Sequence, residues 1–455
     1  MNQQIGFLLN KSLECLRSSN LESADLYLKQ AIRLQTNNPH TLRLLGVIAA
    51  KRERYSEALN YLKSSLKLLP KNSLTLSNLG NVFLALRDYD KALDAYDKSI
   101  NLDPKYEEVW SNKGNALYAL KRFEEAIAHY DKALGLRPDY HEASWNKSLS
   151  LLLQGDFSNG LPLYESRWKL DKVSKAAGKR VFDKPTWLGL ESLQSKTILL
   201  YGEQGLGDFI QFCRYSKPVS DLGAQVILEV PESLVSLSAN LQGVSRIVIQ
   251  GGGLPPFDFQ CPLLSLPLAL QTNVNNIPHV SSYITLHNIP HKVVEWRTRL
   301  GLKVKPRIGL VWSGNPQHNN DNNRSLLLKD ILPYLPNNFE YISLQKDIRD
   351  ADKLTLESNP KILNFSNNLN DFGDTAALID ALDLVITVDT SVAHLSGALG
   401  KKTWVLLSHV PDWRWLLDRN DSPWYAAVNL YRQSTIDDWG GALENIKKDL
   451  LAFDK

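Results

Sequence analysis

The sequence predicts a multidomain α plus α/β protein, with a helical repeat array followed by two lobes built on parallel sheets. Two observations indicate this. In the amino-terminal third, glycine, alanine and proline recur at a fixed spacing of 34 residues. Beyond residue 190, apolar runs of about five residues alternate with amphipathic stretches, as in parallel sheets covered by helices. With 455 residues the chain is long enough for several separate cores.

Composition narrows the class of protein. The chain is 43% hydrophobic and 22% charged, and 52 basic against 49 acidic residues give a net charge of +3. This balance gives no indication of a nucleic-acid partner. Its three cysteines are scattered, so neither a disulfide framework nor a cysteine metal site is expected. No run of 18 apolar residues and no signal peptide is recognisable, so we expect a cytoplasmic protein without a transmembrane segment.

The repeat has a clear register. A small residue recurs where two helices would cross, and a large one recurs where they would interlock. The pattern resembles the tetratricopeptide repeat, which implies a right-handed α-solenoid over residues 1–170. Ala24, Leu28 and Ala31 continue the frame upstream, and Gly155 to Trp168 continue it loosely downstream, which gives three clear repeats and two degenerate ones. The residues in register are Gly46, Gly80 and Gly114; Ala58, Ala92 and Ala126; Leu62, Tyr96 and Tyr130; and Pro70, Pro104 and Pro138.

Solenoids of this kind bind peptides or proteins in their concave groove, so we expect a protein partner. A spacer or dimerisation arm is the alternative, which leaves a homo-oligomer open.

After a basic linker at residues 171–190, the periodicity changes to that of two α/β lobes. We expect the first lobe at 191–290 and the second at 291–455, with a cleft between them at the carboxyl ends of the strands. The expected strands are Lys196–Tyr201, Gln225–Val230, Arg246–Ile249 and Phe257–Cys261 in the first lobe, and Arg307–Trp312, Tyr341–Leu344, Ile362–Phe365, two strands between Leu384 and Leu407, and Val428–Tyr431 in the second.

Residues 384–407 form a strand, a small-residue helix and a second strand. Asp389, Thr390 and Ser391 lie where the first strand ends and the helix begins. The amides and dipole of a helix start bind phosphate, so this segment predicts a site for a diphosphate-bearing ligand. The alternative is that these residues only cap the helix.

The loop after the first strand of the first lobe contains Gln204, Gly205, Gly207 and Asp208. Its Gly-x-Gly lacks the third glycine of a dinucleotide fingerprint, so no cofactor is expected. Asp208 at the helix entrance would direct a carboxylate over the cleft, where it could act as a general base. Its alternative role is to cap the helix.

The corresponding loop of the second lobe is long and polar, with Gly314, Asn315, His318 and Arg324. Arg324 could bind a diphosphate in a bidentate manner, and His318 could donate to it. Lys346 follows another strand at the same edge and is a further candidate cation. Surface salt bridges are the alternative for these residues.

Metal binding is not expected. Asp88 and Asp90, and Asp350 and Asp352, form the Asp-x-Asp pairs, and neither pair directly follows a strand. We interpret both as solvated faces.

Three tryptophans, Trp413, Trp415 and Trp424, lie close together near the end of the chain. Such rings can stack on a base or sugar at a cleft mouth. We favour the other interpretation, that they pack a carboxy-terminal helix onto the domain.

Four segments carry a resemblance to the lipopolysaccharide heptosyltransferases, a GT-B family (glycosyltransferase family 9): YGEQGLGDFIQFCRY, GLVWSGNPQHNNDNNRS, ITVDTSVAHLSGALGKKTWVLL and PDWRWLLDRNDSPWY. The resemblance implies a GT-B pair of Rossmann-like lobes, with an acceptor lobe followed by a donor lobe, and a metal-independent, inverting transfer from a nucleotide-sugar donor. It implies Asp208 as the catalytic base and Asp389, Thr390 and His394 as donor-binding residues. Ser391 stands where that family has glycine, which puts a heptose donor in doubt.

Repeats fused to such a catalytic half are also similar to O-GlcNAc transferase and the flagellin glycosyltransferases. This implies a protein Ser/Thr acceptor, flagellin or another surface protein, recruited by the repeats. One alternative is a lipid-linked or polysaccharide acceptor, for which Lys172, Lys175, Lys179 and Arg180 are a mild indication. The other is a non-enzymatic scaffold with a degenerate transferase domain.

Overall fold

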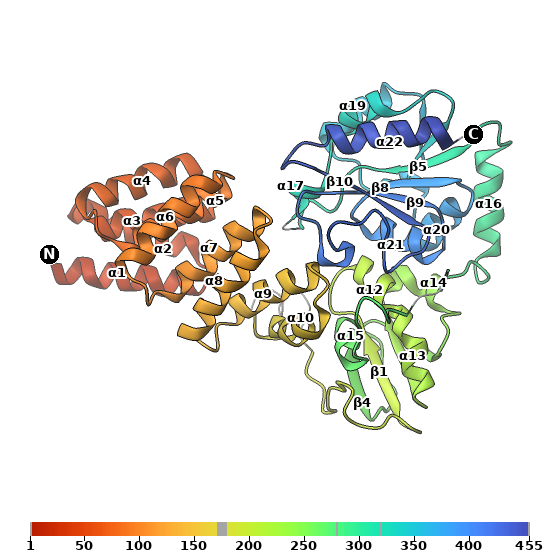
Figure 1. Ribbon diagram of the computed structural model, residues 1–455, viewed down its shortest axis with the longest axis horizontal. Coiled ribbons are helices and arrows are strands. Elements are labelled where there is room, and N and C mark those ends of the chain that lie inside the picture. The colour runs from red at the N-terminus through yellow and green to blue at the C-terminus, as the bar shows by residue number, and fades with distance from the viewer. Residues whose placement is uncertain (1, 171–179, 279–280, 319, 454–455) are drawn as a thin grey trace. The chain divides into compact units, whose positions relative to one another are not determined.

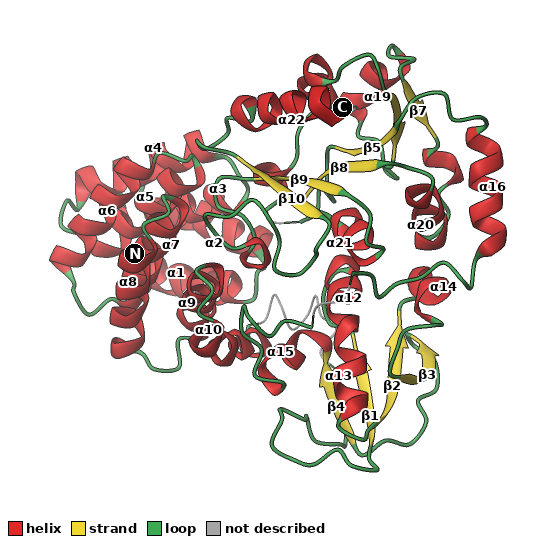
Figure 2. Ribbon diagram, turned by 45° about the vertical axis from the view of Figure 1, so that its right-hand side comes forward, coloured by secondary structure: helices red, strands yellow, loops and turns green. Residues whose placement is uncertain are grey.

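The computed structural model describes residues 2–170, 180–278, 281–318 and 320–453. The chain divides into two compact units, Met1–Ser150 and Leu151–Lys455. The first unit is all helical, and the second contains two parallel sheets (Figures 1 and 2). Most of the expected linker, residues 171–179, lies outside the described residues.

The first unit consists of antiparallel helix pairs, and the pairing continues past its end. The helix α9 crosses the division between the units, and α10 belongs to the second unit. The bounds are α1 Asn2–Arg17, α2 Leu21–Leu34, α3 Pro39–Lys51, α4 Tyr55–Leu68, α5 Ser73–Ala85, α6 Tyr89–Leu102, α7 Glu107–Ala119, α8 Phe123–Leu136, α9 His141–Leu153 and α10 Phe157–Tyr164.

The repeating glycines make room for the repeating large side chains, as the spacing predicts. A Cβ atom on Gly80 would lie 2.5 Å from the ring of Tyr96, and one on Gly114 would lie 2.5 Å from the ring of Tyr130. Both tyrosine rings are buried. Close approach of the two helices of a pair therefore depends on glycine in the first helix.

The turn inside each helix pair also repeats. Ser19, Glu53, Arg87 and Lys121 have φ angles of 60°, 59°, 60° and 58°, and Gly155 in the last pair has 84°. These residues follow one another at the 34-residue spacing. The backbone of the repeat therefore persists in the first and last pairs, where the sequence pattern is degenerate.

Two parallel sheets make up the centre of the second unit. The first has the strand order β3-β2-β1-β4, and the second has the order β10-β9-β8-β5-β6-β7. All the apolar runs that predict strands form strands at the expected places. Their bounds are β1 Thr197–Tyr201, β2 Gln225–Val230, β3 Val244–Ile249, β4 Phe259–Pro262, β5 Arg307–Val311, β6 Glu340–Ser343, β7 Ile362–Asn364, β8 Leu384–Val388, β9 Thr403–Leu407 and β10 Val428–Arg432.

Helices cover the second sheet on both faces. The helices α19 and α22 lie over one face, and α20 and α21 lie over the other (Figures 1 and 2). The strand residues Ile308 and Ile386 are buried in one core with Leu443 and Ile446 of α22. The helix bounds are α12 Leu206–Phe212, α13 Ser216–Asp221, α14 Val235–Ser238, α15 Leu266–Ala269, α16 Pro290–Leu300, α17 Asp321–Arg324, α18 Leu328–Ile331, α19 Asp350–Glu357, α20 Phe372–Asp380, α21 Ser391–Ala398 and α22 Gly440–Phe453. Of the described helices, none has the length and apolar character that crossing a bilayer requires.

The strand orders define where a ligand would bind. In the first sheet the chain order reverses between β1 and β4, and in the second between β5 and β8. Ligands of open parallel sheets bind at the carboxyl ends of the strands beside such a reversal. The loops that begin after Tyr201, Val311 and Val388 leave the sheets at these points.

The tryptophans near the end of the chain are buried, as the packing interpretation expects, but their partners differ from the expected helix. The Trp413 ring lies 5.6 Å from that of Phe157 in α10 and 6.3 Å from that of Phe212 in α12. Trp424 contacts the same two rings at 6.3 and 5.6 Å. These rings therefore join α10 and α12 to the second lobe.

We expect Gly80→Ala to destabilise the solenoid by about 1–3 kcal/mol, because the added methyl group overlaps the Tyr96 ring and the helices must move apart. Urea unfolding followed by far-UV circular dichroism measures the change. The matched control is Gly135→Ala in α8, where a Cβ atom meets nothing within 4 Å. This control should leave stability unchanged or raise it by up to about 1 kcal/mol. Equal effects of the two substitutions would contradict the packing role of Gly80.

Candidate active site

A cavity of about 1150 Å³ opens at the carboxyl ends of both sheets. Segments that are far apart in the sequence line it: the start of α12 in the first lobe, and the loops after β5, β6, β8 and β9 in the second. Its size suits a nucleotide-sized ligand. The residues expected from the sequence that line it are Gly205, Gly207, Asp208, Gly314, Asn315, His318, Arg324, Lys346, Asp389, Thr390, Ser391 and His394.

Gln204 is the one expected loop residue that is not among those lining the cavity. Its amide nitrogen lies 3.5 Å from the hydroxyl of Tyr164, at the end of α10. Gln204 belongs to the loop that leads into α12, and its side chain points toward α10.

The two lobes contact each other where α12 and α21 begin. A Cβ atom on Gly207 would lie 2.9 Å from His394 Cδ2 and 3.3 Å from Ser391 Cα. Glycine at position 207 therefore permits the backbone of one lobe to contact α21 of the other.

The start of α21 is not capped by its own N-cap side chain. Thr390 is extended, with φ −142° and ψ 176°, and makes no side-chain capping hydrogen bond. Its hydroxyl lies 3.3 Å from that of Thr387 instead. The N-cap side chain therefore does not cap this helix, contrary to the capping interpretation. The helix start lines the cavity, where its dipole is available to an anion.

Arg324 lies beside this helix start. Its Nη1 donates to the carbonyl oxygen of Asp389 at 2.8 Å, and its Nε lies 3.8 Å from the carboxylate of the buried Asp321. The close approach of its guanidinium requires glycine at 314, where a Cβ atom would lie 2.7 Å from Nη2. The loop after β5 thus presents a cation at the end of β8.

Arg349 supports this loop, and no sequence pattern singled this residue out. Its Nη2 donates to Asp321 Oδ2 at 2.6 Å and to the carbonyl oxygen of Gly314 at 2.8 Å. Asp321 also accepts from the hydroxyl of Ser325 at 2.8 Å. These bonds join Gly314, Asp321 and Ser325 of the polar loop to one another and to Arg349.

Lys346 and His318 lie at the outer wall. The ammonium group of Lys346 donates to the backbone carbonyl oxygen of Leu369. This contact is a hydrogen bond to the backbone and not the surface salt bridge that was the alternative. His318 is exposed, and its Nδ1 accepts from the backbone N–H of Asn320 at 3.2 Å. Shielding by the cavity wall, and then the charge of Arg324, lower the pKa of His318.

His394 is buried and neutral at physiological pH. Burial lowers its pKa to about 3, and the nearby charge of Arg414 acts in the same direction. Its Nδ1 lies 3.0 Å from the Tyr425 hydroxyl, and its ring stacks on Trp415 with centroids 5.4 Å apart. Its Nε2 lies 4.0 Å from Asp389 Oδ1, and with a neutral imidazole this contact is not an ion pair.

Asp389 is the acid beside this imidazole. Burial raises its pKa to about 6, and the charge of Asp412 adds to the increase.

Asp208 caps α12 and also lines the cavity. It is the third residue of α12, and its Oδ2 accepts the backbone N–H of Gly205 at 2.9 Å, which caps the helix. It also lines the cavity, and its Oδ1 accepts from Arg414 Nη2 at 2.5 Å. Burial raises the pKa of this carboxyl, while the charge of Arg414 opposes the increase.

Arg414 was not recognised from the sequence as a site residue. It lies in the short helix Trp413–Trp415 after β9, is 6% exposed, and donates through Nη1 to Asp412 Oδ1 at 2.8 Å. Its partner Asp208 is 206 positions away in the sequence. No local sequence pattern predicts such a contact.

Within the described ranges, no group of three or more His, Cys, Asp or Glu side chains is placed to hold a metal ion. The interpretation of Asp352 as solvated was wrong. This residue is fully buried, and its carboxylate accepts from Trp312 Nε1 at 3.0 Å and from the backbone N–H of Leu328 at 2.8 Å. Asp88, from the other pair, caps α6 by accepting the N–H of Lys91.

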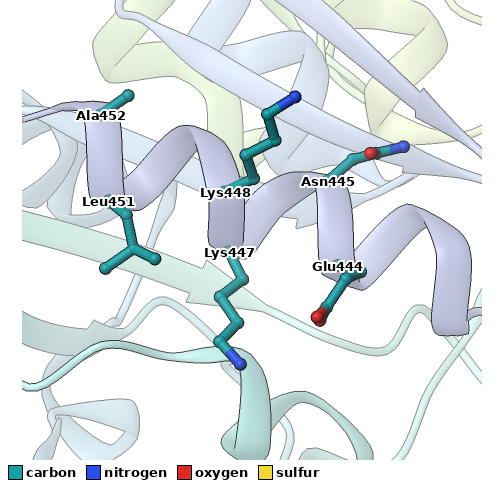
Figure 3. A pocket seen from close by; sticks show the side chains of 6 residues that line it. All are labelled: Glu444, Asn445, Lys447, Lys448, Leu451 and Ala452. Carbon is teal, nitrogen blue, oxygen red and sulfur yellow. The ribbon is translucent and has the colours of Figure 1, made fainter.

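A second hollow of about 470 Å³ lies on α22 (Figure 3). The side chains of Lys447 and Lys448 extend in different directions from the helix, so they do not converge on one point. None of the residues expected to be functional lines this hollow.

Of the four basic residues noted around the linker, Arg180 lies in the described part of the chain. Arg180 pairs with the buried carboxylate of Glu229 on β2, which neutralises its charge. Lys172, Lys175 and Lys179 lie outside the described residues.

Comparison with known proteins confirms the repeats. Models of the tetratricopeptide repeat match residues 41–105, 77–141 and 112–171. Protein FlbA of Caulobacter vibrioides is 23% identical over 331 residues, which cover 67% of this chain and 54% of FlbA. The chain thus spans about half the length of this relative.

Solved structures also match. MamA from Desulfovibrio magneticus is 23% identical, with 37% of this chain and 96% of that chain covered and a TM-score of 0.31. A tetratricopeptide-repeat protein of Thermus thermophilus is 18% identical, with 37% and 92% covered and a TM-score of 0.35.

The buried His394 predicts a specific pH dependence of stability. A histidine with a folded pKa of about 3 and an unfolded pKa near 6.5 contributes stability at neutral pH that is lost as the pH falls below about 6.5. Between pH 8 and pH 5 this loss amounts to about 2 kcal/mol. We expect His394→Gln to lose less stability than the wild type over this interval, as measured by urea unfolding at both pH values. Parallel losses in the two proteins would contradict the assignment of a neutral His394.

Proposed function

We propose that the protein is a nucleotide-sugar-dependent glycosyltransferase, with its two sheet lobes forming a GT-B pair. The observation that carries this proposal is the cavity at the carboxyl ends of both sheets, which an uncapped helix start lines from one lobe and the Asp208 carboxylate lines from the other. The first lobe would bind the acceptor, and the second would bind the donor.

The donor side would stabilise a leaving diphosphate by charge and by backbone amides. The start of α21 would bind phosphate oxygens, with Arg324 beside it and Lys346 and His318 at the cavity wall. Electrostatic stabilisation of a leaving group by such fixed donors contributes several kcal/mol without a metal ion.

Asp208 would act as the general base. Each carboxylate oxygen accepts one hydrogen bond, from Gly205 or from Arg414, and each retains a further lone pair. Burial raises the pKa of this acid, which makes it a better proton acceptor than an exposed aspartate. Attack from the face opposite the diphosphate would invert the anomeric carbon.

The repeats support a protein acceptor. Tetratricopeptide repeats are protein-interaction scaffolds, and a scaffold joined to a transferase would raise the local concentration of its bound substrate. We therefore propose Ser/Thr hydroxyls of a protein as acceptors. A lipid-linked or polysaccharide acceptor has lost part of its support, because Arg180 is paired with Glu229.

One observation favours the alternative of a non-enzymatic scaffold. The candidate base is already engaged by Arg414 and by its own helix start, as a purely structural aspartate would be. Measurements of nucleotide binding and of sugar transfer distinguish the enzyme from the scaffold.

We expect the wild type to bind a nucleoside diphosphate, and we expect Arg324→Met to weaken this binding at least about tenfold, because the cation beside the phosphate site is lost. Isothermal titration with UDP, GDP and ADP measures the affinity. The matched control is Arg297→Met in α16, whose exposed guanidinium pairs with Asp380 outside the cavity. No binding of any nucleotide by the wild type would favour the scaffold.

We expect Asp208→Asn to lower the transfer rate at least about 100-fold while nucleotide binding is retained, because asparagine can still cap α12 but cannot accept a proton. Intact-mass spectrometry of proteins from a deletion strain complemented with each variant reports the transferred sugar and the acceptor together. An unchanged mass increment with the asparagine variant would contradict the role of Asp208 as base.

A further inference from the structure

The cavity carries less free positive charge than its arginines suggest. The guanidinium of Arg414 is bonded to two carboxylates, those of Asp208 and Asp412. Both of these acids, together with Asp389, line the same cavity. An incoming diphosphate would therefore meet these three carboxyl groups beside a guanidinium that is already paired, and Asp347, Asp350 and Asp371 also line the cavity.

Of the two acids, Asp412 is the permanent partner of Arg414. Besides its bond to Nη1, Asp412 Oδ1 accepts the backbone N–H of Arg414 at 3.0 Å, so the two residues belong to one turn. Asp208, in contrast, comes from the other lobe, and its second oxygen is fixed by Gly205. The carboxylate would remain in place if Arg414 moved away.

The guanidinium of Arg414 also has a hydrogen-bond donor that is not used. Arg414 is 6% exposed, yet its Nε has no hydrogen-bond partner. Its planar group lies over the rings of Trp413 and Phe212, at 4.8 and 5.3 Å from their centroids. A guanidinium in this position can turn toward a phosphate in the cavity while it stays against the rings.

We propose that Arg414 is a diphosphate-binding residue that Asp208 occupies in the absence of ligand, so that a bound diphosphate and Asp208 compete for one guanidinium. The inference rests on the proposed function and deepens it. Binding of the donor transfers Arg414 from Asp208 to the diphosphate and frees Asp208 Oδ1 for the acceptor hydroxyl. The base thus becomes available only when the donor is bound, which disfavours proton abstraction in an empty site.

The test is the affinity for inorganic pyrophosphate and for the nucleoside diphosphates, measured by isothermal titration on the full chain. Asp208→Asn removes the competing charge but keeps an oxygen for the Gly205 N–H. We expect this variant to bind pyrophosphate about five- to tenfold more tightly than the wild type, because the binding-competent orientation of Arg414 no longer has a competitor. Arg414→Met should bind it more weakly than the wild type.

The matched control is Asp347→Asn, which removes the same charge from the same cavity at a position that is not a partner of Arg414. It should change the affinity less than about twofold. Thermal unfolding checks that each variant is folded. If Arg414→Met does not fold, the pyrophosphate affinity of Asp208→Asn still tests the competition.

Two results would overturn the inference. If the wild type binds nucleoside diphosphates and Asp208→Asn binds pyrophosphate no more tightly than Asp347→Asn, Arg414 is not under competition, and the proposed function stands without it. If neither the wild type nor Asp208→Asn binds any diphosphate, both the inference and the proposed function fail.

Discussion

The ion pair between Asp208 and Arg414 is the contact on which the candidate site depends. It joins the first turn of α12 to the loop after β9, and with Asp412 it encloses a guanidinium that is almost fully buried. A buried charge is tolerated only when its partners surround it, and removal of one partner is costly. The same three side chains therefore join the two lobes of the second unit and contribute to the charge balance of the cavity.

The two helix starts that face the cavity are built in opposite ways. In α12 the helix supplies its own anion, because Asp208 accepts the N–H of Gly205. In α21 the N-cap residue Thr390 makes no such bond, and the acid before it, Asp389, has its pKa raised by burial. A carboxylate at one helix start and a start without a side-chain cap at the other are what the proposed base and leaving group would need.

Local patterns in the sequence predicted the repeats, the strands and twelve of the residues that line the cavity. Gly80 and Tyr96 could be paired because the 34-residue spacing repeats the contact, and Asp389 could be placed because it follows an apolar strand. The environment of each group could not be predicted. Asp352 is buried because Trp312 and Leu328 donate to it from other elements, and Arg414 reaches Asp208 across 206 positions. Contacts of this kind have no periodicity, so the sequence alone carries no signal for them.

The contacts of α10 give a physical reason why the sequence of the last repeat is degenerate. A repeat in the middle of a solenoid packs on the next repeat, and its sequence is constrained by that contact. The ring of Phe157 in α10 packs on Trp413 instead, and Arg167, just beyond α10, is fully buried with Glu203 at the end of β1 and Ser265. The helix α10 thus packs on the α/β lobes, and Trp413, which it contacts, immediately precedes Arg414. A change in the packing of α10 would therefore act first on the loop that holds the buried guanidinium.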